Sequence, residues 1–251
     1  MRGLTSALVV MAASVALAPS ARAGSERELP KEYRRAPYSL MSLTVGHPND
    51  GWQVRAKRLK RTRSLVIKPS SAAHCYGHPA LVLMLRRSAA ELARAARGSV
   101  MVVGDLSRAE GGPLSGHHSH QSGRDADVAF YVKDASGKPV VLDHFVKFDA
   151  RGRAADGSGL VFDDWRNWLL VLSWLRDGRA GLSHVFVASW LKHRLIAFAE
   201  SRKDFAGYVP AALRLLHQPP NAEAHDDHFH VRISCPKRQL GLCKEESRAA
   251  D

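Results

Sequence analysis

The sequence predicts an α+β fold: a single domain with a mainly antiparallel central sheet, flanked by helices and long loops. Helical and strand periodicities are mixed along the chain without a regular strand–helix–strand alternation. No repeat and no linker divides the 251 residues, a length that one domain can fold. The composition, with 45% hydrophobic and 24% charged residues, excludes a disordered or collagen-like chain.

The N-terminus has the features of a secretory signal peptide. Arg2 precedes an apolar stretch over 4–18, which is too short to span a bilayer comfortably, and an A-x-A motif follows at 21–23. We predict a signal peptide over 1–23 that is removed on export to the periplasm, with an uncleaved anchor as the alternative. Cleavage lowers the formal charge from +13 to +11 and leaves no membrane span. A basic exported protein attracts anionic partners.

The chain after the cleavage site is expected to contain three parts. Residues 24–44 form a polar, extended lead-in, 45–245 the folded domain and 246–251 a C-terminal tail. The basic run over 55–63 is interpreted as a solvated face or strand edge, because lysines at sheet edges discourage aggregation.

Four helices are predicted. In the first, Leu81, Leu85 and Leu92 recur at helical spacing, and Gly98 follows as a stop signal. The second begins at a cap provided by Asp163 or Asp164. The predicted ranges are 79–97, 164–177, 189–201 and 210–217.

Four strands are predicted where short runs of β-branched and aromatic residues occur. A loop rich in Gly, Ser and His separates the first two, and the segment after the second carries turn residues with little periodicity. The predicted ranges are 101–105, 127–132, 185–188 and 229–234.

Two segments, 115–127 and 225–230, combine imidazoles and carboxylates at a density that is costly to bury without a shared partner. A divalent metal is the obvious partner. On the predicted last strand, His228 and His230 face one side while Phe229 faces the other. Surface histidines on a solvated strand are the alternative, and the three ionisable residues just before them argue against it.

Asp127 begins a predicted strand and can meet His120 across the turn at Ser122-Gly123. With one histidine of the second segment, they form a set of two imidazoles and one carboxylate. Three such ligands, with a fourth position for water, are typical of catalytic zinc. Iron(II) is the alternative, although its sites usually need a close His-x-Asp pair, which this sequence lacks. No H-E-x-x-H, G-x-S-x-G, P-loop or dinucleotide motif occurs.

The chain resembles the penicillin-insensitive murein endopeptidases, within the wider group of lysostaphin-like and D-Ala-D-Ala metallopeptidases. The resemblance covers roughly residues 45–245. The matching motifs are Ser119-His-Gln-x-Gly-x-Asp-x-Asp127 and His225-x-x-His-x-His-Val-Arg232, with shorter matches at Gly104-Asp105, Gly111-Gly112 and Gly116-His117.

This resemblance implies a zinc metallopeptidase in which His120, Asp127 and His230 bind the metal. It implies that His228 lies against the metal-bound water as a base or transition-state partner, and that His225 is also catalytic. The implied reaction is hydrolysis of the D-alanyl–meso-diaminopimelyl cross-link of peptidoglycan, which is the expected partner, whereas nucleic acid is not. The alternatives are a D,D-carboxypeptidase or dipeptidase, or a non-catalytic basic module that binds the cell wall.

In the family, the histidine that matches His117 can join a second metal site with a downstream Asp-x-x-His pair. No such pair occurs between residues 130 and 180, so we expect one zinc per chain and assign His117 to a second metal or to support of the site. Arg124 and Arg232 could bind substrate carboxylates, or be ordinary surface residues. Either aspartate of the pair 226–227 could orient an imidazole.

Three cysteines are too few for a disulfide scaffold. Cys235 and Cys243 lie eight residues apart after the last strand, and a disulfide there would hold the C-terminal segment behind that strand. Soft metal ligation is the alternative, which Pro236 and export both disfavour. Cys75 is then left single.

Overall fold

The computed structural model describes residues 27–220 and 223–245, so the predicted signal peptide and C-terminal tail lie outside the described residues. The chain separates into two compact units, of which the first ends at Ser39 and the second begins at Leu40. In the first unit, residues 31–34 form a short 3-10 helix within the segment for which an extended lead-in was expected. None of the described helices is both long and apolar enough to cross a membrane.

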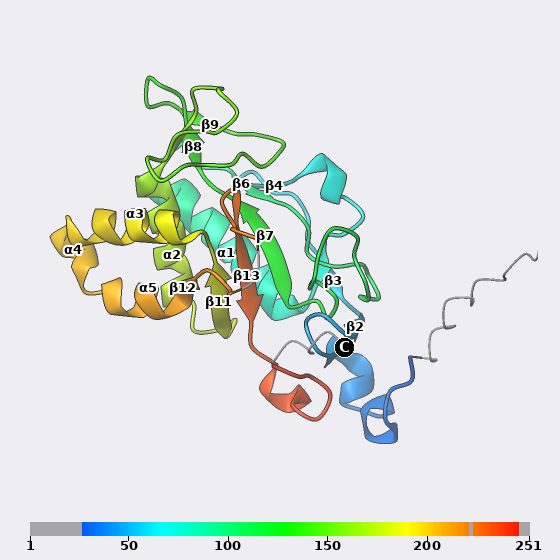
Figure 1. Cartoon of the computed structure of the whole chain (residues 1–251). Coiled ribbons are helices and arrows are strands. Elements are labelled where there is room, and N and C mark those ends of the chain that lie inside the picture. Colours follow the sequence, from blue (N-terminus) through cyan, green and yellow to red (C-terminus); the bar gives the residue numbers. More distant parts are fainter. Residues whose placement is uncertain (1–26, 221–222, 246–251) are drawn as a thin grey trace, which may run out of the picture. The chain divides into compact units, whose positions relative to one another are not determined.

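A six-stranded sheet organises the second unit (Figure 1). Its central pairs are antiparallel, whereas the outermost pair at each edge is parallel, so the sheet is mixed rather than uniformly antiparallel. From one edge to the other the strands are β12 (Leu216–His217), β11 (Leu182–Phe186), β13 (His228–Ile233), β7 (Asp125–Ala129), β6 (Met101–Val103) and β4 (Leu65–Ile67).

Five α-helices and seven further strands accompany the six-stranded sheet among the described residues. The helices are α1 (Pro79–Ala95), α2 (Asp164–Arg176), α3 (Ser189–Glu200), α4 (Lys203–Ala206) and α5 (Val209–Leu215). The remaining strands are β1 (Leu43–Gly46), β2 (Gly51–Val54), β3 (Lys57–Arg58), β5 (Tyr76–Gly77), β8 (Val132–Lys133), β9 (Pro139–Val140) and β10 (Val161–Phe162).

The alternation of side chains along β13 separates the core from the opposite face of the sheet. Phe229, Val231 and Ile233 are buried in the hydrophobic core. The Phe229 ring lies edge-to-face against Trp174 of α2, with the ring centroids 5.4 Å apart. The histidines of β13 therefore point to the face of the sheet that α2 does not cover.

The four predicted helices are confirmed with small shifts at their ends, but residues 216–217, predicted as the end of the last helix, form strand β12, and α4 was not predicted. Asp163 caps α2 by accepting a hydrogen bond from the Arg166 backbone N–H at 3.1 Å. The cap position of α3 is Ala188, and no side chain caps this helix. Strand β7 begins at Asp125, two residues before the predicted start, and β11 begins at Leu182, three residues early.

The start and the end of the second unit are hydrogen-bonded to each other. Gly46 at the end of β1 donates its N–H to the Leu242 carbonyl at 2.8 Å and accepts from the Lys244 N–H at 3.0 Å. The predicted Cys235–Cys243 disulfide is present and closes the C-terminal segment, with the two Cα atoms 5.6 Å apart.

Candidate metal and catalytic centre

The register of the two central strands brings the candidate residues together. His230 on β13 is paired with Asp127 on β7, so their side chains are neighbours on the face away from α2. His120 reaches the same point from the long loop between β6 and β7. Its backbone adopts φ +66°, a left-handed conformation that is uncommon for a histidine and concentrates at functional sites.

Three potential ligand atoms converge at this point. The Asp127 Oδ1 atom lies 3.2 Å from His120 Nε2 and 3.3 Å from His230 Nδ1, and the two ring nitrogens are 3.3 Å apart. Ligands around a tetrahedral zinc ion, at about 2.0–2.1 Å from the metal, stand about 3.3 Å from one another. The spacing therefore fits a tetrahedral divalent ion.

The hydrogen bonds on the far side of the two rings suit a cation at this point. His120 Nδ1 donates to the Leu106 carbonyl at 2.6 Å, and His230 Nε2 donates to Asp125 Oδ1 at 2.9 Å. In the neutral rings, the nitrogens that face Asp127 then carry lone pairs. Asp127 Oδ1 is buried and has no hydrogen-bond partner among the described residues. Three electron-rich atoms within 3.3 Å of one another favour a shared cation such as a metal ion.

Both acidic residues of β7 are buried and charged. Burial opposes the charge, but the facing imidazoles of His120 and His228 hold the pKa of Asp127 well below its usual range. Behind His230, burial is likewise overcome by Arg232, whose guanidinium Nε donates to Asp125 Oδ1 at 2.5 Å and keeps the pKa of Asp125 far below normal. Asp125 thus fixes His230 from behind, as outer-shell carboxylates do in metal sites.

His228 faces the same carboxylate oxygen, with its Nε2 atom 3.3 Å from Asp127 Oδ1. Its other nitrogen, Nδ1, donates to Asp227 Oδ1 at 2.5 Å, and its ring stacks on Phe145 with centroids 4.8 Å apart. Burial works against its positive charge, but Asp127 and Asp227 raise the pKa of His228 to about 10. Of the two aspartates considered from the sequence, Asp227 is the one that orients an imidazole.

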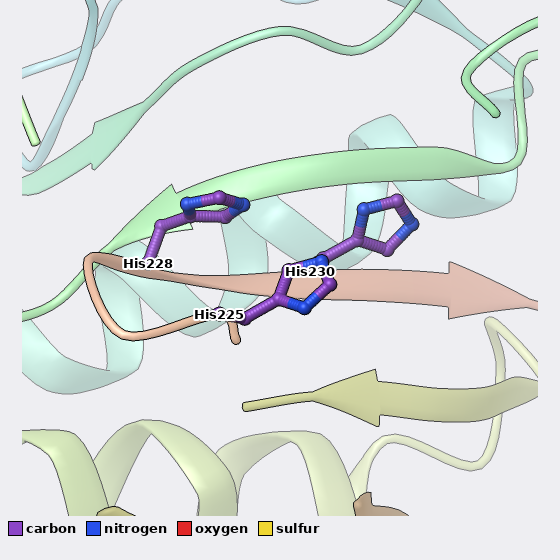
Figure 2. Close-up of side chains that lie close together, drawn as sticks. All are labelled: His225, His228 and His230. Carbon is purple, nitrogen blue, oxygen red and sulfur yellow. The ribbon is translucent and has the colours of Figure 1, made fainter. Parts of the chain in front are cut away.

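His225 enters the site from the segment before β13. Figure 2 shows its ring beside those of His228 and His230, which rise from the strand itself. The three residues offer ligand atoms that all lie within 4.8 Å of one another. Burial and the two neighbouring histidines lower the pKa of His225 to about 4, so it is neutral at pH 7. Its buried Nδ1 has no hydrogen-bond partner among the described residues.

His117 lies between two carboxylates. Its Nε2 is 3.1 Å from Asp105 Oδ2, and its Nδ1 is 3.7 Å from Asp127 Oδ2. His74 holds the other oxygen of Asp105 at 3.1 Å. With His120 and Asp127, His117 makes a second group of potential ligands within 4.8 Å of one another.

Arg124 and Arg232 fit neither of the two alternatives considered from the sequence, substrate binding or an ordinary surface position. Both side chains are buried. Arg232 donates a hydrogen bond to Asp125, and Arg124 donates to the backbone carbonyls of Ile233 and Lys244 in the C-terminal segment. Sequence reasoning assigned no role to several residues that shape the site: His74, Asp105, Asp125 and Phe145. Asp105 and Asp125 stand within the matching motifs, and Asp125 also precedes Asp127 by two positions and therefore shares its strand face. His74 and Phe145 left no local signal.

Sequence comparisons with known proteins all point to one family. The sequence model of the family described as penicillin-insensitive murein endopeptidase matches residues 44–251. A protein with that name from Haemophilus influenzae is 30% identical over 172 residues, which is 64% of this chain and 52% of that protein. One from Escherichia coli O157:H7 is 24% identical over 235 residues, covering 93% of this chain and 78% of that protein. The chain thus spans about half the length of the Haemophilus relative.

Proposed function

The chain belongs to the family of penicillin-insensitive murein endopeptidases, and from this premise we propose that it is a zinc-dependent hydrolase of peptidoglycan cross-links. The proposed bond is the D-alanyl–meso-diaminopimelyl amide. With the predicted signal peptide, this substrate places the proposed site of action in the periplasm.

His120 Nε2, Asp127 Oδ1 and His230 Nδ1 are the proposed zinc ligands. When bound in such a set, zinc lowers the pKa of a coordinated water towards neutrality and polarises the carbonyl to be attacked. Leu106 and Asp125 hold the two ligand rings in the tautomer that leaves the metal-facing nitrogens unprotonated.

His228 is the proposed partner of the developing oxyanion. Because its pKa is raised to about 10 and Asp227 accepts its Nδ1–H, its Nε2 carries a proton that can be donated to the oxyanion. His225 is neutral and has an unpartnered ring nitrogen facing the same space, so it suits taking a proton from the attacking water and returning it to the leaving amine. The convergence of two unprotonated ring nitrogens on the orphaned Asp127 oxygen is the observation that supports this proposal.

Digestion of purified murein sacculi tests the proposed function. We expect the mature protein to release peptides with fewer cross-links, and a chelator to stop the release until zinc is restored. Bound but intact sacculi would instead indicate a wall-binding module. Release of only the terminal D-alanine would indicate a carboxypeptidase.

Two alanine variants separate metal binding from proton transfer. His120→Ala should lose both turnover and stoichiometric zinc, because one of three ligands is gone. His228→Ala should lose turnover yet retain most of the zinc. Zinc content by atomic absorption, with circular dichroism as a folding control, decides between them. The opposite pattern would contradict the ligand assignment.

A further inference from the structure

A groove with a cavity volume of about 710 Å³ lies beside the sheet, along the edge strand β4. Its volume falls within the range of known ligand sites. Apolar side chains, among them Val66, Ile67 and Val102, form part of its wall. Four cationic residues also line it: Arg58, Lys60, Arg61 and Lys68.

The described residues do not neutralise the charge of this basic groove. Asp143 is the only acidic residue of its lining, and its carboxylate already bonds His144 Nδ1 at 2.8 Å. Among residues 27–220 and 223–245, no carboxylate forms a salt bridge with any of the four cations. Clefts lined by one sign of charge concentrate ligands of the opposite sign. The groove is therefore built for an anionic occupant.

A single aromatic ring separates this groove from the candidate metal site. Lys68 Nζ lies 4.4 Å from the centroid of the Phe145 ring, whose other neighbour is the stacked ring of His228. Gly104 permits this arrangement, because a Cβ atom there would lie 2.5 Å from Phe145 Cζ and 3.4 Å from Asp127 Cβ. The basic groove therefore begins at a residue, Lys68, that is one aromatic ring away from His228.

We propose that the basic groove binds free carboxylates of the peptide that continues from the scissile bond. This inference rests on the proposed function. In the proposed substrate, the leaving amine stands on a carbon that also bears a carboxylate, so negative charge lies next to the bond to be cut. Lys68 is placed nearest the reacting groups, while Lys60 and Arg61 contact carboxylates further along the peptide. This assigns a substrate-binding role to part of the basic run over 55–63.

The double variant Lys60→Gln/Arg61→Gln tests the inference on the full-length mature zinc enzyme. With a soluble cross-linked muropeptide, we expect KM to rise about fivefold while kcat and zinc content stay unchanged, because exposed ion pairs contribute modestly to binding. The wild-type enzyme should prefer this substrate over one with amidated carboxylates, and the variant should lose that preference. The matched control is Arg86→Gln/Arg94→Gln, which removes two exposed arginines from α1 outside the groove.

Three results would overturn the inference: an unchanged KM, an equal rise in KM for the amidated substrate, or an equal effect of the α1 control. An affinity loss confined to an oligonucleotide probe would also overturn it, since the groove would then serve nucleic acid. Failure of the proposed function is recognised separately, because the wild type would then release nothing from sacculi. In that case, binding of the uncleaved muropeptide to wild type and variant still tests the groove.

Discussion

At the scale of single residues, two aspartates on one strand have different tasks. Asp125 and Asp127 project from the same face of β7, but Asp127 meets the candidate ligand histidines, whereas Asp125 lies behind His230 and against Arg232. Both carboxylates are almost fully buried. Each is kept charged by cationic or hydrogen-bonding partners, without which burial would favour the neutral acid.

Asp125→Asn should weaken zinc binding by about 10- to 100-fold, the usual effect of losing an outer-shell carboxylate. The asparagine amide fills the same space, but it has no negative charge to neutralise Arg232 or to hold the proton on His230 Nε2. Competition with a chromophoric chelator measures the affinity. Asp227→Asn is the control, because its partner His228 is a proposed catalytic residue and not a proposed metal ligand: it should lower kcat and leave zinc affinity unchanged. Equal affinities for Asp125→Asn and the wild type would refute the role of Asp125.

The sequence carried enough information to single out His120, Asp127, His228 and His230 as a set, because strand alternation and motif spacing act locally. It did not carry the contact between His74 and Asp105, which lie 31 positions apart and meet only through the fold. The stacking of Phe145 on His228 was hidden for the same reason. Phe145 lies in a segment without periodicity, so nothing local indicated its position.

At the scale of elements, β13 joins the core to the site. Its Phe229 is fully buried against Phe130 and Trp174. Phe229→Ala should lower the free energy of unfolding by about 3–5 kcal/mol, since it leaves a cavity beneath the histidine face. Urea unfolding of the zinc-loaded protein measures this loss. Leu213→Ala on α5, where the side chain is 45% exposed, should change stability by less than about 0.5 kcal/mol. Similar losses for both variants would contradict this account of the core.

The N-terminus of α1 makes stability depend on pH. His78 caps this helix by accepting the Ala80 N–H at 3.2 Å, and burial, together with the charge of Arg124, lowers the pKa of His78 to about 4. An unfolded histidine titrates near 6.5. As pH falls from about 6.5 to 4, His78 therefore binds a proton in the unfolded state but not in the folded state, and the free energy of unfolding decreases.

His78→Asn keeps a capping side chain but removes this titration. Between pH 7 and 4.5, the wild type should lose roughly 2 kcal/mol more stability than the variant, as measured by urea unfolding at each pH. The site histidines are common to both proteins, so their contribution cancels in the comparison. Parallel pH profiles for the two proteins would show that His78 does not cause the effect.

Elements of ten or more residues were predictable, because three turns of helix suffice to show a period. Strands as short as β3 and β8, with two residues each, show no sequence periodicity, and their formation depends on the strands they pair with. The early start of β7 was missed for a different reason. Asp125 and Asp127 place charged residues inside a strand, which contradicts strand propensity and makes sense only beside a cation.

At the scale of the whole molecule, the proposed ligands come from three separate parts of the chain: the loop before β7, β7 itself and β13. Only the folded state assembles them, so zinc should stabilise that state. With zinc about 1,000-fold above its dissociation constant, we expect roughly 4 kcal/mol of added stability, and a chelator should lower the melting temperature accordingly. His120→Ala should melt at the same temperature with and without zinc. If the chelator leaves the wild-type melting temperature unchanged, these three segments do not share a bound metal.

The contact between β1 and the segment around Leu242 joins parts of the domain that are far apart in the order of synthesis. If the chain is exported as proposed, its N-terminal part crosses the membrane first. Gly46 then has no hydrogen-bond partner in this contact until residues 242–244 have also crossed. His230, the last of the proposed ligands, also arrives late. If the chain crosses unfolded, a hydrolase directed at the cell wall would assemble its centre, and become active, only after translocation is complete.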